Sequence, residues 1–312
     1  MANGILNINK PRGVTSFSIV KLVRSLTGVK RVGHAGTLDP MADGVLPICL
    51  GHATRIVEYL VGAPKVYAAT VRLGAATDTY DSEGAVTNAG DWSAVTREQV
   101  EAALLGFTGT IQQVPPAYSA LKHEGKPLYQ YAREGKSTPR EARTVHVYTL
   151  ELRSFAPPLL EFYMEVGRGT YVRSLAHDLG EQLGCYALLE HLTRVRTGPF
   201  DVERALSLEA FQTAVEARTW EDLLQPVDFV LESWYAALLA EEHSNDVRQG
   251  RIVELEAASQ GFLELPSDSK CRAYSDTGDF LAVLKYAGSG LWKPEKVFLP
   301  LEGRGSPSFG SP

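Results

Sequence analysis

The order of hydrophobic and polar positions over residues 1–200 mixes two periods, one typical of strands and one typical of helices. Apolar or alternating runs predict strands at residues 4–9, 45–50, 65–73, 110–114, 145–155, 159–166 and 190–197. Apolar residues at helical spacing predict helices at residues 16–27, 54–60, 96–105 and 171–183. We therefore expect a mixed α/β (α+β) domain in which a mostly antiparallel sheet is flanked by helices.

Residues with capping character stand at the ends of these helical runs. Ser16 is a suitable N-cap for the first helix, and Gly28 suits its C-terminal end. Thr96 and Gln99 have the spacing of a capping box, and Gly184 follows the last of these helices. These residues support the helical assignments independently of the apolar spacing.

The pattern changes after residue 200. Residues 201–232 have the helical and acidic character of connecting structure, and short strand-like segments then begin near Tyr235. These segments lie at residues 252–255, 271–274, 280–286 and 296–298. We expect a large domain at 1–232, a small β-barrel or sandwich at 233–300 and a disordered tail at 301–312.

Composition narrows the class of protein. The chain has 312 residues, 44% of them hydrophobic, which is enough to bury a full core. No apolar run approaches the ~20 residues of a membrane span, and no signal peptide is evident, so we expect a cytoplasmic protein. The three cysteines, Cys49, Cys185 and Cys271, are isolated, and the histidines form no close metal pair. We therefore expect no disulfide framework and no metal site.

Charge is unevenly distributed along the chain. Residues 1–200 hold 21 Lys and Arg against 18 Asp and Glu, whereas residues 201–312 hold 10 against 19. Within residues 122–143, six basic side chains stand against three acidic ones, beside Tyr129 and Tyr131. This segment is either a solvated excursion or an arm that grips a nucleic acid through phosphate contacts and stacking. The candidate phosphate contacts are Lys122, Lys126, Arg133 and Lys136.

The segment Gly33–Gly44 contains the strongest candidate for chemistry, Asp39. Glycines give this loop backbone freedom, and Pro40 keeps Asp39 out of the helical region, so we expect a carboxylate presented from a rigid turn. An Asp before Pro is also a common turn former. A basic approach through Lys30 and Arg31 favours a nucleophile that meets an anionic substrate.

Two other polar features invite explanation. Arg173 stands in the first turn of a predicted helix, where the helix dipole disfavours a cation, so we expect it to have an ion-pair partner or a functional role. The acidic segment at residues 77–84 could bind calcium, although its spacing does not follow an EF-hand loop.

Six ordered stretches together resemble the TruB family of tRNA pseudouridine synthases. They are Lys10-Pro11; Gly33-His34 through Leu38-Asp39-Pro40 to Gly44; Lys65-Val66-Tyr67; Leu73-Gly74 through Thr77-Asp78-Thr79 to Asp81; Pro115 through Ala120; and Gly169 through Ser174. Single pieces such as Leu-Asp-Pro are weak signals, but their order over residues 4–200 makes the resemblance specific.

The resemblance implies roles for the residues that match the motifs of the family. Asp39 would be the nucleophile of a uridine-to-pseudouridine isomerisation, Tyr67 would stack on the target base and take part in proton removal at C5, and Arg173 would pair with Asp39. Four residues would complete the substrate site: Tyr171 and Leu192 as walls of the uracil pocket, His34 against the disrupted RNA loop, and Asp81 in the polar network.

The resemblance also implies a substrate and an architecture. The substrate would be the uridine at position 55 in the T-loop of tRNA, and the reaction would use no cofactor and no metal. The small C-terminal domain would be a PUA-like RNA-binding module. We expect a monomer with no obligate protein partner, acting on the T-arm of tRNA.

Other interpretations stay open at this stage. Without the resemblance, Tyr67 and Leu192 are ordinary core residues of strands. A subunit of an RNA-guided pseudouridine synthase would share the catalytic motifs, although guided relatives shorten the arm. A non-catalytic tRNA-binding or tRNA-folding protein would need the arm but not Asp39. A glycoside hydrolase would pair Asp39 with Asp43 or Asp78.

Overall fold

A long, mainly antiparallel sheet forms the centre of the larger domain. The computed structural model describes residues 2–255, 266 and 268–298, and over these residues nine strands form this sheet in the order β1-β3-β12-β4-β11-β10-β7, with β2 beside β3 and β13 beside β12. The strands are β1 (Gly4–Lys10), β2 (Val32–His34), β3 (Asp43–Leu50), β4 (Lys65–Leu73), β7 (Gly109–Gln113), β10 (Arg143–Ala156), β11 (Leu159–Val166), β12 (Ala187–Thr197) and β13 (Phe200–Asp201).

The strand β12 lies between β3 and β4 and joins the two halves of this sheet. It pairs in parallel with β3 and antiparallel with β4. In the register, Arg194 lies between Gly44 of β3 and Tyr67 of β4. A Cβ atom on Gly44 would lie 2.3 Å from the carbonyl oxygen of Arg194, and Gly44 has φ +100°, so this close approach requires glycine.

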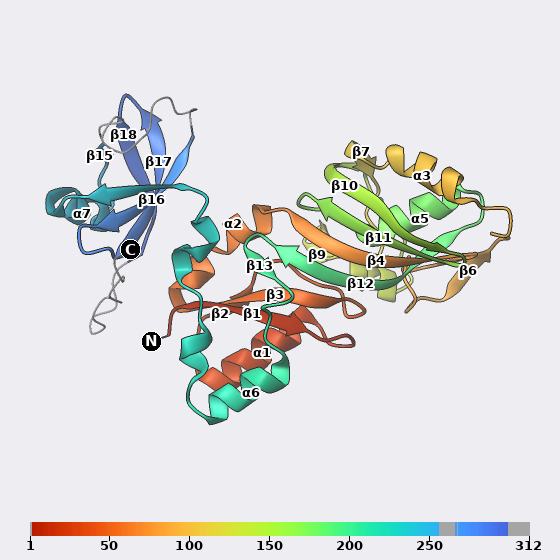
Figure 1. Ribbon diagram of the computed structural model, residues 1–312, viewed down its shortest axis with the longest axis horizontal. Coiled ribbons are helices and arrows are strands. Elements are labelled where there is room, and N and C mark those ends of the chain that lie inside the picture. Colours follow the sequence, from red (N-terminus) through yellow and green to blue (C-terminus); the bar gives the residue numbers. More distant parts are fainter. Residues whose placement is uncertain (1, 256–265, 267, 299–312) are drawn as a thin grey trace.

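Helices cover the sheet at both of its ends (Figure 1). The helices of this domain are α1 (Ser16–Thr27), η1 (Gly51–Arg55), α2 (Val57–Gly62), α3 (Arg97–Leu105), α5 (Val172–Gln182), α6 (Leu208–Glu216), η2 (Trp220–Leu223) and η3 (Val227–Leu231). The short helix α4 (Leu128–Arg133) lies apart from the sheet. Ile19, Val20 and Val23 of α1 are buried and belong to the same core cluster as Leu175 and Leu179 of α5. Full burial of such a side chain contributes roughly 1.5–3 kcal/mol.

The C-terminal part of the chain forms a second, smaller β structure with its own core. Its five strands lie in the order β14-β16-β17-β18-β15 and pair mostly antiparallel, with β14 parallel to β16. The elements are β14 (Tyr235–Leu239), α7 (Glu241–Arg248), β15 (Val253–Glu254), β16 (Lys270–Ser275), β17 (Phe280–Gly288) and β18 (Leu291–Val297). The curled sheet buries Trp292 with Leu239, Val247 and Leu281. The predicted mixed fold with a small C-terminal β part is confirmed.

The helix α2 connects this β structure to the larger domain. The Tyr59 hydroxyl donates to Glu295 Oε1 at 2.8 Å, and its ring packs edge-on against Trp234 with the ring centroids 5.1 Å apart. The ammonium groups of Lys270 and Lys296 lie 5.0 and 5.9 Å from the centroid of the same ring. The Tyr59 side chain therefore makes a hydrogen bond, an edge-on ring contact and two cation–π contacts at this junction.

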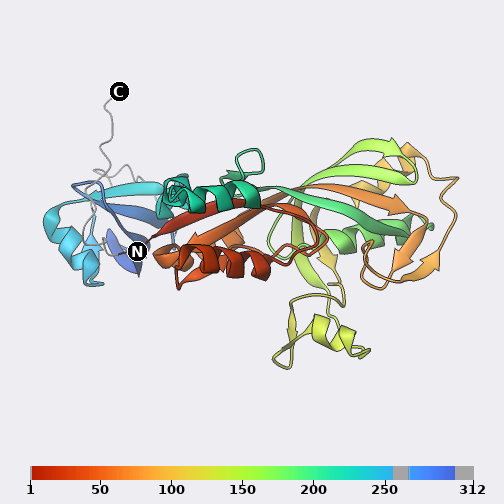
Figure 2. The same ribbon diagram turned by 90° about the horizontal axis from the view of Figure 1, so that it is seen from below.

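Two short hairpins extend from the larger domain. One consists of β5 (Ala75–Thr77) and β6 (Val86–Ala89), and the other of β8 (Lys122–His123) and β9 (Lys126–Pro127), which α4 follows. Figure 2 shows the hairpin β8–β9 and α4 projecting away from the body of the domain. The predicted arm at 122–143 thus has secondary structure of its own and projects from the domain.

Most element predictions agree with the structure, and several need correction. The N-cap of α1 is Thr15, whose hydroxyl accepts a hydrogen bond from the Ser18 amide, whereas Ser16 is buried inside the first turn. The predicted loop from Gly33 begins with strand β2, and Gly33 does not have a positive φ. The helix α7 and strands β6 and β14 were not predicted, and the expected tail at 301–312 lies outside the described residues.

The predicted capping box of Thr96 and Gln99 is confirmed at α3. Cys49, Cys185 and Cys271 are free and buried. None of the helices in the described ranges is long and apolar enough to cross a membrane.

Candidate active site

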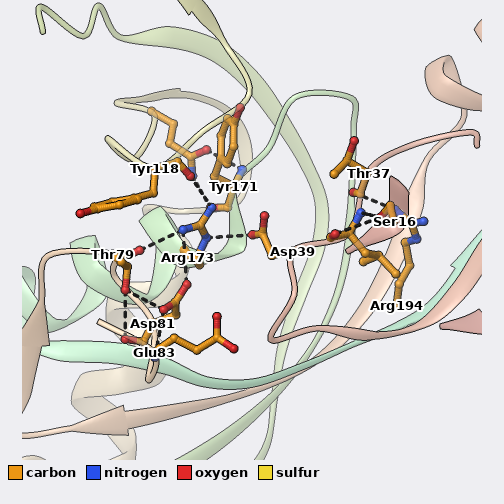
Figure 3. A network of polar contacts seen from close by, with 12 residues as sticks. Ser16, Thr37, Asp39, Thr79, Asp81, Glu83, Tyr118, Tyr171, Arg173 and Arg194 are labelled. Atoms are coloured by element: carbon orange, nitrogen blue, oxygen red, sulfur yellow. Dashed lines mark hydrogen bonds and ion pairs between the residues drawn. The ribbon is translucent and has the colours of Figure 1, made fainter. Parts of the chain in front are cut away.

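The loop that carries Asp39 is anchored from two sides. The Ser16 hydroxyl donates to the Leu38 carbonyl at 3.0 Å and accepts from the Leu38 amide at 2.8 Å. The buried guanidinium of Arg194 donates to the carbonyl oxygens of Gly36 at 2.9 Å and Val45 at 2.7 Å. These contacts hold the backbone on both sides of Asp39. Figure 3 shows Asp39 between Arg173 on one side and Ser16 and Arg194 on the other.

Arg173 is the ion-pair partner of Asp39. Its Nε atom lies 2.9 Å from Asp39 Oδ2, and its Nη1 atom lies 3.3 Å from Asp81 Oδ2. The same guanidinium donates to the carbonyl oxygens of Thr79 at 3.1 Å and Tyr118 at 2.9 Å. The expected partner of this cation in the first turn of α5 is therefore present, and the favourable contacts offset its placement near the positive end of the helix.

The acidic turn after β5 supplies two of these acceptors. Its carboxylates fold the turn: Asp81 Oδ1 accepts from the Thr79 hydroxyl at 2.6 Å and the Glu83 amide at 3.1 Å, and Asp78 accepts from the Ala85 amide at 2.8 Å. Within the described ranges, no group of three or more His, Cys, Asp or Glu side chains is placed to hold a metal ion. The turn positions Arg173, and the geometry gives the calcium hypothesis no support.

A pocket of about 270 Å³ opens beside Asp39 and Arg173. Tyr67 on β4, Leu192 on β12 and Tyr171 at the start of α5 are part of its lining. Four cationic side chains also line it: Lys65, Arg168, Arg173 and Arg194. Asp39 is the one carboxylate among the described lining residues, so the pocket combines aromatic and apolar walls with an excess of positive charge.

Burial shifts the pKa values of several ionisable groups in and near this pocket. Burial raises the pKa of the Asp39 carboxyl above its ordinary value, Arg173 opposes this rise and the negative charge of Asp81 adds to it. Burial also raises the pKa of Tyr171 and lowers the pKa of Lys65 and of Lys10 to about 8. The Asp39 side chain is still 37% exposed, so a substrate can reach it.

Comparisons with known proteins identify the family of the chain. The profile of the TruB family pseudouridylate synthase N-terminal domain matches residues 24–172, and that of the tRNA pseudouridylate synthase B C-terminal domain matches residues 173–232. A relative from Dehalococcoides mccartyi named tRNA pseudouridine synthase B is 41% identical over 95% of this chain and 97% of its own. A relative of the same name from Geobacter sulfurreducens is 41% identical over 96% of this chain and 98% of its own.

The chain belongs to the TruB family. It is therefore an isomerase of the pseudouridine synthase type. A solved structure described as a Cbf5-Nop10-Gar1 complex contains a chain with the same fold, with a TM-score of 0.74 and 26% identity over 95% of this chain and 85% of that chain.

Three residues weighed as partners or neighbours of Asp39 lie outside the pocket of this TruB-family chain. Asp43, at the start of β3, lines a separate groove and places its Oδ2 atom 3.4 Å from His191 Nε2. Asp78 folds its own turn. The geometry therefore gives no support to a glycosidase pair with either carboxylate. His34 ends β2, where burial lowers the pKa of its ring, and it is not among the described lining residues.

Some supporting residues of the TruB site were missed by sequence reasoning. The side-chain amide of Gln113 accepts from the Tyr171 amide at 2.8 Å and donates to its carbonyl at 3.1 Å, which fixes the start of α5. The Lys65 ammonium donates to the Val61 and Ala63 carbonyls, each at 2.6 Å, at the end of α2. The sequence carries no distinctive signal for Arg194, because Glu190, His191 and Arg196 make the same strand polar. Its burial, which requires acceptors, is visible only in the structure.

The cationic side chains in the arm of this TruB-family chain differ in whether they form an ion pair. Lys126 and Lys136 both pair with Glu134, the latter at 2.9 Å, and these pairs lower the pKa of Glu134 to about 2. Arg133 lies over the ring of Tyr129, 5.4 Å from its centroid. Lys122 begins β8 and is exposed. Two of the four candidate phosphate contacts are thus already paired with a carboxylate.

Proposed function

We propose that the chain isomerises the uridine at position 55 in the T-loop of tRNA to pseudouridine, with Asp39 as the nucleophile. The ion pair between Asp39 and buried Arg173, inside a pocket that Tyr67, Tyr171 and Leu192 help to line, is the observation that carries this proposal. The names of the relatives and the cationic lining of the pocket support an RNA substrate.

The reaction requires three changes: the N1–C1′ bond breaks, the detached base turns, and C5 bonds to C1′. An ionised carboxylate can attack the sugar, attack the base or assist glycal formation, and all three routes begin from the charged form of Asp39. Arg173 favours that charged form and fixes the orientation of the carboxylate.

The target uridine leaves the stacked loop to reach the pocket, which costs a few kcal/mol of lost stacking. Tyr67 replaces part of that stacking and takes part in removal of the proton at C5, while Tyr171 and Leu192 form walls around the base. His34, which lies outside the pocket lining, contacts the disrupted RNA loop. The arm grips the T-arm through Lys122, Lys126, Arg133 and Lys136. The chain acts as a monomer in the cytoplasm and needs no protein partner.

Tritium release from C5-labelled uridine in an unmodified T-arm RNA tests this function. RNAs labelled only at position 55 or only at position 54 identify the target, and Asp39→Asn and Asp39→Ala test the nucleophile. Asp43→Asn is the matched control, because Asp43 lies four residues away and lines a different groove. We expect release from position 55 alone, loss of release in both Asp39 variants, and tRNA affinity within roughly tenfold of the parent.

Two results would contradict the proposal. Substantial release by a verified Asp39→Ala protein would exclude Asp39 as the nucleophile. Tight binding of the T-arm without release by the intact protein would instead favour a guided subunit that requires partners, or a non-catalytic tRNA-binding protein.

A further inference from the structure

Tyr80 has an unusual backbone conformation next to the residues that hold Arg173. Its φ is +65°, a left-handed conformation that a residue with a large side chain rarely adopts. It lies between Thr79, whose carbonyl accepts from Arg173 Nη1, and Asp81, whose carboxylate pairs with the same Nη1 atom. The left-handed turn at Tyr80 lets two acceptors from neighbouring residues converge on one nitrogen.

The ring of Tyr80 stacks on His177. The ring centroids are 3.9 Å apart and the planes are inclined by 6°. His177 lies four residues after Arg173 in α5, so both side chains project from one face of the helix. Within the described part of the chain, the buried Nδ1 atom of His177 has no hydrogen-bond partner, so the stack with Tyr80 orients this ring without the help of a hydrogen bond at that atom.

The backbone around Tyr80 is also fixed to the strand that forms a wall of the pocket. The Leu189 amide of β12 donates to the Tyr80 carbonyl at 3.0 Å, and the Ser82 amide donates to the Leu189 carbonyl at 3.0 Å. The turn is therefore held by α5 through a side chain and by β12 through its backbone. The side chain of Asp81 in this turn is only 5% exposed.

We propose that Tyr80 and His177 are positioning residues for the isomerisation: their stack holds the turn at residues 79–81 so that Arg173 stays aligned with Asp39. This inference rests on the proposed function of Asp39. Neither ring is among the residues that line the pocket in the described ranges, so both act through Arg173. If the stack is removed, the turn relaxes, Arg173 loses alignment, and the charged form of Asp39 is less favoured.

The test compares variants that remove the stack with variants that preserve it. Tyr80→Gly removes the ring but tolerates positive φ, and His177→Ala removes the other ring. Tyr80→Phe and His177→Phe retain an aromatic surface. We expect Tyr80→Gly and His177→Ala to lower kcat roughly tenfold with KM within about twofold, and the Phe variants to stay close to the parent.

Two readouts separate positioning from a purely structural role. The acidic limb of the kcat–pH profile should move to higher pH in Tyr80→Gly and His177→Ala, because Arg173 then opposes the raised pKa of Asp39 less effectively. Hydrogen–deuterium exchange of residues 77–84 should accelerate in the same two variants, with exchange of the C-terminal β structure unchanged as an internal control.

The outcomes distinguish this inference from the proposed function. An intact protein without tritium release contradicts the function, and the exchange measurement still decides whether the stack holds the turn. An active protein in which Tyr80→Gly and His177→Ala have parental kcat, pH profile and exchange overturns the inference alone. A lower kcat with an unmoved acidic limb also overturns it, since the loss would not pass through Asp39.

Discussion

In the ion pair between Arg173 and Asp39, the cation is the more deeply buried partner. Nε and Oδ2 lie 2.9 Å apart, yet the Arg173 side chain is 5% exposed and that of Asp39 is 37% exposed. Arg173 also binds Asp81 and the Thr79 and Tyr118 carbonyls, so its position does not depend on Asp39 alone. A carboxylate that reacts with a substrate can therefore change its contacts while its counterion stays in place.

Arg173→Lys should lower turnover about a hundredfold or more and leave tRNA affinity within a few-fold. A lysine ammonium keeps the charge but cannot reproduce the planar set of donors that contacts four acceptors. Tritium release and filter binding measure the two quantities. Arg72→Lys is the matched control, because Arg72 forms a 2.9 Å ion pair with Glu190 in which the two side chains are 43% and 36% exposed, and Arg72 does not line the pocket. A parental rate for Arg173→Lys would show that one positive charge suffices.

Asp39→Asn should be at least as stable as the parent at pH 7. Because the folded state raises the pKa of Asp39, the folded protein binds this proton more tightly than the unfolded chain, and stability falls as pH rises from the ordinary pKa of 3.8 through the raised value. Asn cannot ionise, so the variant does not lose this stability as pH rises. Its greater free energy of unfolding relative to the parent should therefore shrink as pH falls towards 4. Urea unfolding at both pH values, with Asp43→Asn as control, measures it. A lower free energy of unfolding for Asp39→Asn at pH 7 contradicts the prediction.

Arg194→Met should destabilise the protein by about 2–4 kcal/mol. The substitution leaves three carbonyl oxygens, those of Gly36, Thr37 and Val45, without the donor that now binds them. Chemical denaturation gives the free energy of unfolding. Arg196→Met changes the same residue type two positions along β12, where the side chain is 50% exposed, and should cost less than about 0.5 kcal/mol. Equal effects of the two changes would exclude the proposed anchoring.

Replacing Lys122, Lys126, Arg133 and Lys136 together by alanine should weaken tRNA binding and flatten its salt dependence. The slope should fall by about one unit for each lysine or arginine that no longer neutralises a phosphate. Glu134→Gln should have the opposite effect, because it releases the two lysines that now pair with Glu134. Binding isotherms at several salt concentrations measure both variants. An unchanged slope in the fourfold variant means that the arm does not bind phosphates.

Elements with strong local signals were predicted closely. The strand predicted at 65–73 has the same bounds as β4, and the one predicted at 159–166 has the same bounds as β11. The first-turn cation Arg173 correctly indicated an ion pair, because the local electrostatic conflict is visible in the sequence. The second carboxylate of that network, Asp81, came only from the family resemblance.

Features that depend on contacts between distant residues could not be predicted. The strand order could not be predicted from the sequence, because β12 pairs with β3 although about 150 residues separate them along the chain. The anchoring of the loop by Arg194 depends on that same pairing. Asp43 pairs with Thr193 of β12, and a register shifted by one residue would place its side chain on the other face of the sheet.

The place of β12 in the sheet also limits how early the pocket can be complete during synthesis. When Asp39 and Tyr67 have both emerged from the ribosome, β3 and β4 have no common edge, because the strand that separates them comes from residues 187–197. A nascent chain that ends before this strand carries the nucleophile without its pocket wall. The pocket therefore cannot be complete before β12 has been synthesised and has paired with both neighbours.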